Sequence, residues 1–347
     1  MKLSEKEWEP FFISSLFKDP KRGKRIVSSN HIEGDTPLVS SAGDNNGVTA
    51  FIGNREKVRI YENCLSIANG GSSAGKCFYE PFEFIASDHI THCKNEKLTA
   101  NQYLAIASVI TPKLTEKYSF CREITDLRIS REKIMLPVDD AGKPDFEYLE
   151  KYVCDLRKKL VEEYISYAKK ELQKISFLEV PALNEKEWEP FTIEDICYID
   201  SGCDIYDNER VDGNTPYITA TAVNNGIKYY VSNENDTLES NAISVNRNGS
   251  VGYSFYHKYN ALYSNDCRKL KLKQYDNEYV SLFITNQIMQ QREKYSYGYK
   301  MGTGRLRRQY IQLPIKSIGN PDYEYMEQYI KNIIVRKYKA YLEYAEK

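Results

Sequence analysis

The sequence predicts an α+β fold: two tandem mixed domains, each followed by a long helix, with the two helices packed as an antiparallel coiled coil about a pseudo-two-fold axis. Three observations lead to this prediction. The sequence contains an internal repeat, with matching segments 177–180 residues apart. Each copy begins with short β-like runs separated by glycine and asparagine turns, and each copy ends in an amphipathic stretch.

The internal repeat is visible in matching segments along the whole chain. KEWEPF occurs at 6–11 and again at 186–191, and EKYSF at 116–120 corresponds to EKYSY at 293–297. The longer matches pair GDTPLVSSAGDNNGVTAFIGN from Gly34 with GNTPYITATAVNNGIKYYVSN from Gly213, and PDFEYLEKYV from Pro144 with PDYEYMEQYI from Pro321. We therefore expect a first domain over 1–143, a central helix over 144–180, a second domain over 181–320 and a C-terminal helix over 321–347.

The globular part of each copy carries strand and turn signals. Asn46-Gly47 and Asn225-Gly226 are strong hairpin signals because asparagine and glycine tolerate a positive φ. Short strands and helices complete a mixed α+β domain. The expected strands are Cys64–Ala68, Cys77–Tyr79, Ala242–Val245 and Tyr253–Tyr256, and the expected helices are Ala100–Ile110 and Tyr279–Gln290.

The second part of each copy predicts a long amphipathic helix. From Asp145 to about Leu178 there is no glycine or proline, which predicts a helix of more than 30 residues, roughly 50 Å long at 1.5 Å per residue. Two such stripes without another partner should pack on each other. The first stripe is Leu149, Val153, Leu156, Leu160, Tyr164, Ala168, Leu172 and Ile175, and the second is Met326, Ile330, Ile333, Tyr338, Tyr341 and Ala345.

The stretch NGGSSAGKC at 69–77 is one residue short of a phosphate-binding P-loop. A P-loop needs a hydroxyl for magnesium and a helix directly after the lysine. Here Cys77 replaces the hydroxyl, and the aromatic run CFYEPFEF that follows predicts a strand. The second copy, ISVNRNGSVGYSFY at 243–256, shares only strand, glycine turn and strand, so we interpret both as glycine turns.

Composition limits the classes of protein to which the chain could belong. The net charge is −1, with 48 basic and 49 acidic residues, so no overall basic excess marks a nucleic-acid binder. The eight cysteines are scattered and are expected to be free thiols, and His89, His92 and Cys93 lack a fourth metal ligand. The charged N-terminal residues and the absence of a long apolar run predict a cytoplasmic protein without a signal peptide or membrane span.

Four segments together carry a resemblance to a known family. They are EWEPF-x-I, the TP-x-(V/I) run with NNG (36–47 and 215–226), the NRNGSVG turn at 246–252, and the Leu-Pro pairs at 136–137 and 313–314. With this organisation the chain resembles the specificity subunit of type I restriction–modification systems over essentially its whole length. It is also similar to the specificity subunits of type IIB enzymes.

The resemblance implies a DNA sequence-recognition subunit that performs no chemistry itself. Each globular part would be a target-recognition domain for one half of a split double-stranded DNA site, and the helices would be a ruler and a dock for two methyltransferase subunits. S-adenosylmethionine would be bound by that partner, with no cofactor on this chain, and a restriction subunit stays open. Because the copies differ, the half-sites should differ. A ruler of roughly 50 Å would place them more than one DNA turn apart.

Candidate DNA-contacting residues are chosen by chemistry, since arginine and lysine suit guanine, asparagine and glutamine suit adenine, and small polar or basic groups suit phosphate. In the first copy they are Ser40, Ser41, Asn45, Asn69, Ser72, Ser73 and Lys76. In the second copy they are Thr219, Thr221, Asn224, Asn246, Arg247, Asn248, Ser250, Lys300, Arg305, Arg307 and Arg308. KDPKRGKR at 18–25 could grip the backbone, and the NNG turns could be purely structural.

Catalytic readings find less support in the sequence. NPDY at 320–323 lacks the second proline of the loop found in adenine methyltransferases. Glu150-Lys151 could suggest a nuclease site, but such a site needs these residues on a strand, and here they lie on a predicted helix. No hydrolase, zinc-protease or dinucleotide motif occurs. The alternatives left open are a stand-alone DNA-binding or scaffold protein without a methyltransferase partner and, third, a metal-dependent nuclease.

Overall fold

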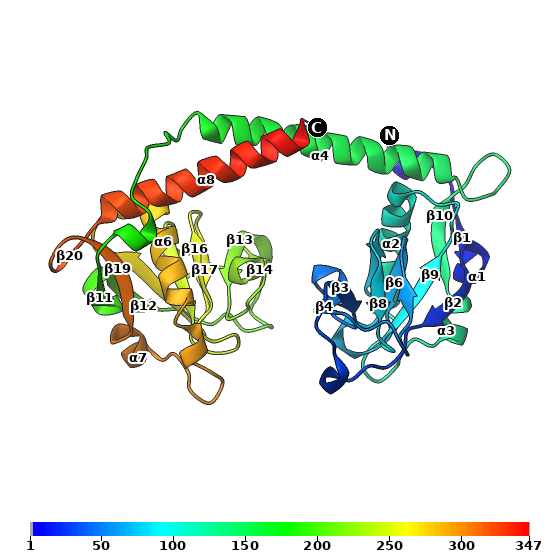
Figure 1. Cartoon of the computed structure of the whole chain (residues 1–347), viewed down its shortest axis with the longest axis horizontal. Helices are drawn as coiled ribbons and strands as arrows, with labels where there is room; N and C mark the ends of the chain where they lie inside the picture. Colours follow the sequence, from blue (N-terminus) through cyan, green and yellow to red (C-terminus); the bar gives the residue numbers. More distant parts are fainter. Residues whose placement is uncertain (1–2, 347) are drawn as a thin grey trace. The chain divides into compact units, whose positions relative to one another are not determined.

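The computed structural model describes residues 3–346 and divides into two compact units, with the boundary between Glu163 and Tyr164 (Figure 1). This boundary falls inside the longest helix, α4 (Phe146–Leu172). The two units contain nearly the same succession of sheets and helices, as the internal repeat predicts. The predicted mixed architecture is confirmed.

Two four-stranded sheets form the body of the first unit. The sheet β2-β9-β6-β7 is antiparallel throughout, and in the sheet β4-β3-β8-β5 only β3 and β8 are parallel. A third pair joins β1 to β10. The strands are β1 (Trp8–Phe12), β2 (Lys18–Arg22), β3 (Thr36–Val39), β4 (Val48–Ile52), β5 (Ile60–Tyr61), β6 (Cys64–Ala68), β7 (Cys77–Glu80), β8 (Phe84–Ala86), β9 (Ile90–Lys94) and β10 (Lys133–Pro137).

Helix α2 (Ala100–Thr115) packs on β6 and β7 and closes the main core of this unit (Figure 1). It begins with a capping box, in which Thr99 accepts a hydrogen bond from the backbone of Gln102 and the Gln102 side chain accepts one from the backbone of Thr99. Leu65 and Ile106 are fully buried between sheet and helix. The short helices are α1 (Ile13–Leu16) and α3 (Asp126–Ser130).

The second unit repeats this plan with one strand fewer in the smaller sheet. Its sheets have the orders β12-β18-β15-β16, β14-β13-β17 and β11-β19-β20, and α6 (Glu278–Met289) packs on β16. The strands are β11 (Trp188–Thr192), β12 (Cys197–Ser201), β13 (Asp212–Ile218), β14 (Ile227–Val231), β15 (Ala242–Asn246), β16 (Ser254–His257), β17 (Leu262–Tyr263), β18 (Cys267–Leu272), β19 (Tyr310–Ser317) and β20 (Asn320–Pro321). The short helices are α5 (Ile193–Ile196) and α7 (Thr303–Arg307).

The strand–glycine turn–strand interpretation of 69–77 is confirmed, because β7 and not a helix follows Lys76. The two Asn-Gly hairpins are also confirmed, between β3 and β4 and between β13 and β14. Asn45, Asn46 and Gly47 all have positive φ, of 46°, 52° and 72°. The predicted helices extend over slightly different residues, since α2 continues five residues further to Thr115. Leu114, fully buried in the core, keeps that last turn in place.

The central helix is shorter than predicted. It ends at Leu172 after 27 residues, about 40 Å at 1.5 Å per residue, instead of continuing to about residue 178. After Leu172, side chains of α8 (Tyr323–Ala345) form hydrogen bonds with the backbone in place of helical ones. The Asn332 side chain accepts one from the N–H of Leu178 (3.3 Å) and donates one to its C=O (2.6 Å). Gln328 likewise donates to the carbonyl of Ser176.

Within the second unit, the end of α4 packs against α8. The rings of Tyr164 and Tyr341 lie 4.5 Å apart, and those of Tyr167 and Tyr338 lie 6.2 Å apart. The residue number falls along α8 as it rises along α4, so these segments are antiparallel, consistent with the predicted coiled coil. In the first unit, Leu149 and Val153 are buried in the core, but Leu156 and Leu160 of the predicted stripe are exposed.

Candidate nucleic-acid interface

Three segments converge in the first unit. We call residues 40–47 the NNG loop, residues 69–76 the glycine turn and residues 116–124 the tip segment. The Ser41 hydroxyl donates a 2.5 Å hydrogen bond to the carbonyl of Gly70, which joins the NNG loop to the glycine turn. The N–H of Ile124 donates to the carbonyl of Asn69 at 2.8 Å, which joins the tip segment to the same turn.

The second unit brings together the equivalent segments: the NNG loop at 219–226, the glycine turn at 246–253 and the tip segment at 293–302. The N–H of Ser250 donates to the carbonyl of Ala220 at 3.1 Å. The Asn246 side chain donates to the carbonyl of Thr221 at 2.9 Å. The Arg292 guanidinium, directly before the tip segment, lies over the Tyr253 ring at 4.5 Å. The same three-segment surface is therefore present in both units.

The glycine turn can approach the helix only because of its glycines. Gly75 has φ +87°, and a Cβ atom there would lie 2.6 Å from the backbone carbonyl carbon of Leu114. In the second unit Gly252 has φ +79° and faces the backbone of Arg292. A side chain at either position would push the turn away from the end of the core helix.

Several of the predicted contact residues lie inside the protein. Asn69 and Asn246 are 1% and 0% exposed, and Ser73 is buried. Asn69 accepts a hydrogen bond from Thr91 at 2.8 Å, and Asn246 holds the neighbouring NNG loop. These three side chains therefore lie beneath the surface, where they support its turns, and are not exposed on it.

The remaining predictions in the loops and turns lie on or near the surface. Asn45, Ser72 and Asn224 are exposed, and a second group is partly buried: Ser40, Ser41, Lys76, Thr219, Thr221 and Ser250. Arg247 and Asn248 both turn toward Asp266, a residue that the sequence analysis did not single out. The Arg247 guanidinium is 3.7 Å from the Asp266 carboxylate, and the Asn248 amide donates to it. Asp266 thus holds the two polar side chains of this turn in one position.

The basic residues in and after the second tip segment fall into two groups, according to the side chains that they contact. Arg305 lies over the ring of Tyr299 at 4.1 Å and donates to the Lys300 carbonyl, and Arg308 lines the same hollow of about 330 Å³. Arg307 instead points to Glu194 on α5, at 3.7 Å. Lys300, Arg305 and Arg308 therefore gather around the tip tyrosines, and Arg307 does not.

Comparison with known proteins identifies the family. The family profile of the type I restriction modification DNA specificity domain, Methylase_S, matches residues 5–163 and again residues 185–344. The chain belongs to this family. Members of the family are non-catalytic specificity subunits, and catalysis is carried by partner subunits.

Individual proteins are similar to this chain over nearly its whole length. The specificity subunit S.BcgI of a type II restriction enzyme from Heyndrickxia coagulans is 33% identical over 328 residues, covering 93% of this chain and 94% of that protein. The S subunit of a type I system from M. genitalium covers 100% of this chain and 94% of its own, with 16% identity and a TM-score of 0.48. The HsdS subunit from Thermoanaerobacter tengcongensis covers 97% and 91%, with 13% identity and a TM-score of 0.34.

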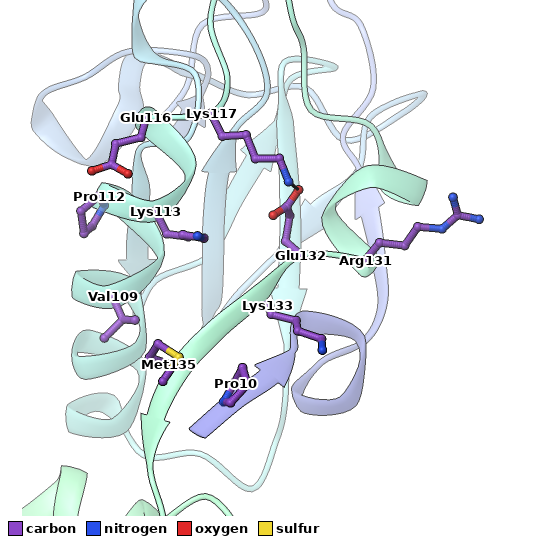
Figure 2. A pocket seen from close by; sticks show the side chains of 10 residues that line it. All are labelled: Pro10, Val109, Pro112, Lys113, Glu116, Lys117, Arg131, Glu132, Lys133 and Met135. Carbon is purple, nitrogen blue, oxygen red and sulfur yellow. Dashed lines mark hydrogen bonds and ion pairs between the residues drawn. The ribbon is translucent and has the colours of Figure 1, made fainter. Parts of the chain in front are cut away.

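In this specificity-domain protein, a basic pocket beside the first tip segment was missed by sequence reasoning. Figure 2 shows the cavity, about 580 Å³, between the end of α2 and β10. Lys117 and Glu132 point toward each other and form a 2.5 Å ion pair. The cations that line the cavity are Lys113, Lys117, Arg131 and Lys133. The internal repeat could have indicated two of these cations, because Lys117 and Arg131 align with Lys294 and Arg308 at an offset of 177.

A side-chain hydrogen bond fixes the base of each tip segment. Tyr118 donates to Glu132 at 2.5 Å, and the equivalent Tyr295 donates to Gln309 at 2.6 Å. Burial and the bond to Glu132 raise the pKa of Tyr118 to about 12. Although burial opposes it, the hydrogen bonds from Lys117 and Tyr118 hold the pKa of Glu132 below its usual range. Both units therefore keep a tyrosine anchor under the tip, although its partner differs.

Other parts of the specificity-domain protein give more limited information. In the KDPKRGKR run, Arg22 is tied inward to the Ile124 carbonyl and lies 3.7 Å from Glu123, whereas Lys18, Lys21, Lys24 and Arg25 are exposed. Within residues 3–346, no cluster of three or more histidine, cysteine or acidic side chains could hold a metal ion. Over the same residues, no helix is both long and apolar enough to span a bilayer.

Proposed function

We propose that the chain recognises a bipartite, asymmetric double-stranded DNA target, with one half-site for each unit. The observation that carries this proposal is the three-segment surface, which has the same backbone construction in both units and different side chains. Asn69 and Gly70 of the first glycine turn are replaced by Arg247 and Asn248 in the second. Because base edges are distinguished by the hydrogen-bonding groups that face them, unlike surfaces should select unlike half-sites.

The exposed part of this surface would make the DNA contacts. In the first unit, Asn45, Ser72 and Lys76 would face the groove, and in the second unit Asn224 and the Arg247–Asn248 pair would do so. Lys300, Arg305 and Arg308 would hold the phosphate backbone, together with the basic pocket of the first unit. The buried residues Asn69, Ser73 and Asn246 would position the turns without touching DNA.

The long helices would dock the partner subunits. Leu156, Leu160 and Val161 are 43%, 55% and 38% exposed on consecutive turns of α4. An apolar strip of this kind on a surface helix fits association with another protein. We propose methyltransferase subunits as the occupants, two of them as the resemblance implies, with S-adenosylmethionine bound on those subunits.

The test is to map methylated bases by long-read sequencing in cells that carry this chain with the methyltransferase encoded beside it, and in cells that lack only this chain. The proposal predicts a methylated motif of two unlike halves separated by a fixed spacer, present only with the chain. Unchanged methylation with an expressed and active methyltransferase would contradict it. The chain would then have to act as a stand-alone binder.

A further inference from the structure

Each tip segment contains a two-residue turn that displays an aromatic ring to solvent. In the first unit, the backbones of Ser119 and Arg122 exchange two hydrogen bonds, of 3.2 and 3.0 Å, around Phe120-Cys121. In the second unit, Ser296 and Tyr299 exchange the same two bonds, at the same lengths, around Tyr297-Gly298. The apex residues Phe120 and Tyr297 are therefore structurally equivalent.

Both apex rings are among the most exposed large side chains of the described residues. Phe120 is 80% exposed and Tyr297 is 78% exposed. The turns beneath them are held by the exchanged backbone bonds and by the Tyr118–Glu132 and Tyr295–Gln309 hydrogen bonds. A hydrogen-bonded turn that presents a large ring to water in both units gains nothing for its own core, which favours a contact with a partner.

The surroundings of the rings fit a polyanion with flat, stackable groups. Lys300 lies over the Tyr297 ring at 5.1 Å, and Arg122, two residues after Phe120, lies over the Tyr118 ring at 5.4 Å. Residues 290–310 contain one acid, Glu293, against six basic residues, in a chain whose net charge is −1. Those basic residues are Arg292, Lys294, Lys300, Arg305, Arg307 and Arg308. Cations beside an exposed ring are the combination that holds a phosphate backbone while the ring contacts a base.

The first tip segment is attached directly to the glycine turn of its unit. The first tip segment begins just after Thr115, which packs against Gly75, and ends at Ile124, which is bonded to Asn69. Both of its ends are therefore attached to the glycine turn. A DNA duplex that contacts the glycine turn would come within reach of the apex ring.

We propose that Phe120 and Tyr297 are specificity-determining residues, each of which packs its ring against a base or base step of its own half-site. Apolar side chains inserted beside bases in a groove are a known way to read and deform a duplex. This inference rests on the proposed function and adds a stacking contact that the polar residues of the surface do not supply. Phe120 serves the half-site of the first unit, and Tyr297 serves that of the second.

The experiment uses the full chain, co-purified with the methyltransferase encoded beside it, and selection of bound duplexes from a library with a randomised segment of about 40 base pairs. Phe120→Ala should weaken binding about ten-fold and remove sequence preference in one half of the selected motif. Tyr297→Ala should do the same in the other half. Phe120→Tyr, which copies the second unit, should restore affinity, and Ile318→Ala is the matched control, because Ile318 is similarly exposed (86%) but lies in the turn between β19 and β20.

The outcomes separate the inference from the proposed function. If the wild-type complex selects no sequence, the proposed function fails. If the wild type selects two half-sites and both alanine variants select the same halves with unchanged affinity, only the role of the tips is wrong. Loss of methyltransferase co-purification in the Phe120→Ala variant, with an unchanged motif, would overturn the inference in favour of a protein contact.

Discussion

The hydroxyl of Ser66 donates a 2.8 Å hydrogen bond to the carboxyl of Glu80, and both side chains are buried. At the equivalent place in the second unit, Ser244 and His257 are 2.9 Å apart and equally buried. The internal repeat has kept a serine on the central strand and replaced its partner on the neighbouring strand by a group of the opposite charge type. Each pair lies on the two strands that flank the glycine turn of its unit, and we expect it to make the two units respond oppositely to pH.

The first unit should lose stability as pH rises. Burial raises the pKa of Glu80 to about 7, despite the hydrogen bond from Ser66. The folded state therefore prefers the neutral carboxyl, and stability present at pH 4 to 5 is lost as pH rises through 7. Glu80→Gln should remove this loss, with a gain of at most about 3 kcal/mol at pH 8 and little change at pH 5. Urea unfolding at the two pH values measures it, and an equal effect at both would refute the explanation.

The second unit should show the opposite dependence. Burial lowers the pKa of His257 from its usual value to about 4. Stability is fully present above pH 6.5 and is lost as pH falls from there toward 4, because the unfolded state takes up the proton first. The NMR titration of the His257 ring should show no protonation at pH 5.5. Observation of a charged ring at that pH would contradict the buried, neutral state.

Gly75→Ala should be much more destabilising than Gly142→Ala. Both glycines have positive φ, +87° and +70°, so both substitutions carry a backbone strain of about 1 kcal/mol. Gly142 has open space around it, whereas a Cβ on Gly75 would overlap the backbone of Leu114 and Thr115. Comparison of the two variants in urea unfolding isolates the close approach of the glycine turn to α2. Equal losses would mean that this contact contributes nothing.

The basic residues at the second tip should govern the salt dependence of DNA binding. Arg305→Ala and Arg308→Ala should each weaken binding at all sequences and reduce the slope of log K against log salt by about 0.9. Arg307→Ala is the control, since its guanidinium faces Glu194 and should leave the slope nearly unchanged. Binding titrations between about 50 and 200 mM salt give the slopes. A larger effect at Arg307 than at Arg305 or Arg308 would reverse the assignment of phosphate contacts.

Much of the fold could be predicted because it depends on local patterns and on the repeat. The strand–turn–strand units and the long helices follow from glycine, asparagine and apolar spacing in short windows. The end of α4 could not be predicted, since it depends on the contact of Asn332 with Leu178, which are 154 residues apart in the sequence.

The candidate site was only partly predictable, for a related reason. Asn69 and Asn246 look like DNA contacts in the sequence, but tertiary packing turns their side chains inward. Arg247 was predicted as a DNA contact, and its ion pair with Asp266, which the sequence did not indicate, appears only in the structure. The apex rings were overlooked because an aromatic residue in a sequence window usually indicates core, and only the closed turns show that Phe120 and Tyr297 point outward.

The central claim is that each unit reads its own half-site. It is tested most directly by mapping methylated motifs in cells that carry variants of one surface at a time, together with the methyltransferase. We expect Ser72→Ala with Lys76→Ala to change only one half of the wild-type motif, and Arg247→Ala with Asn248→Ala to change only the other half. If either pair altered both halves, or if the wild-type motif proved to be a single continuous sequence, the claim of two independent recognition surfaces would be contradicted.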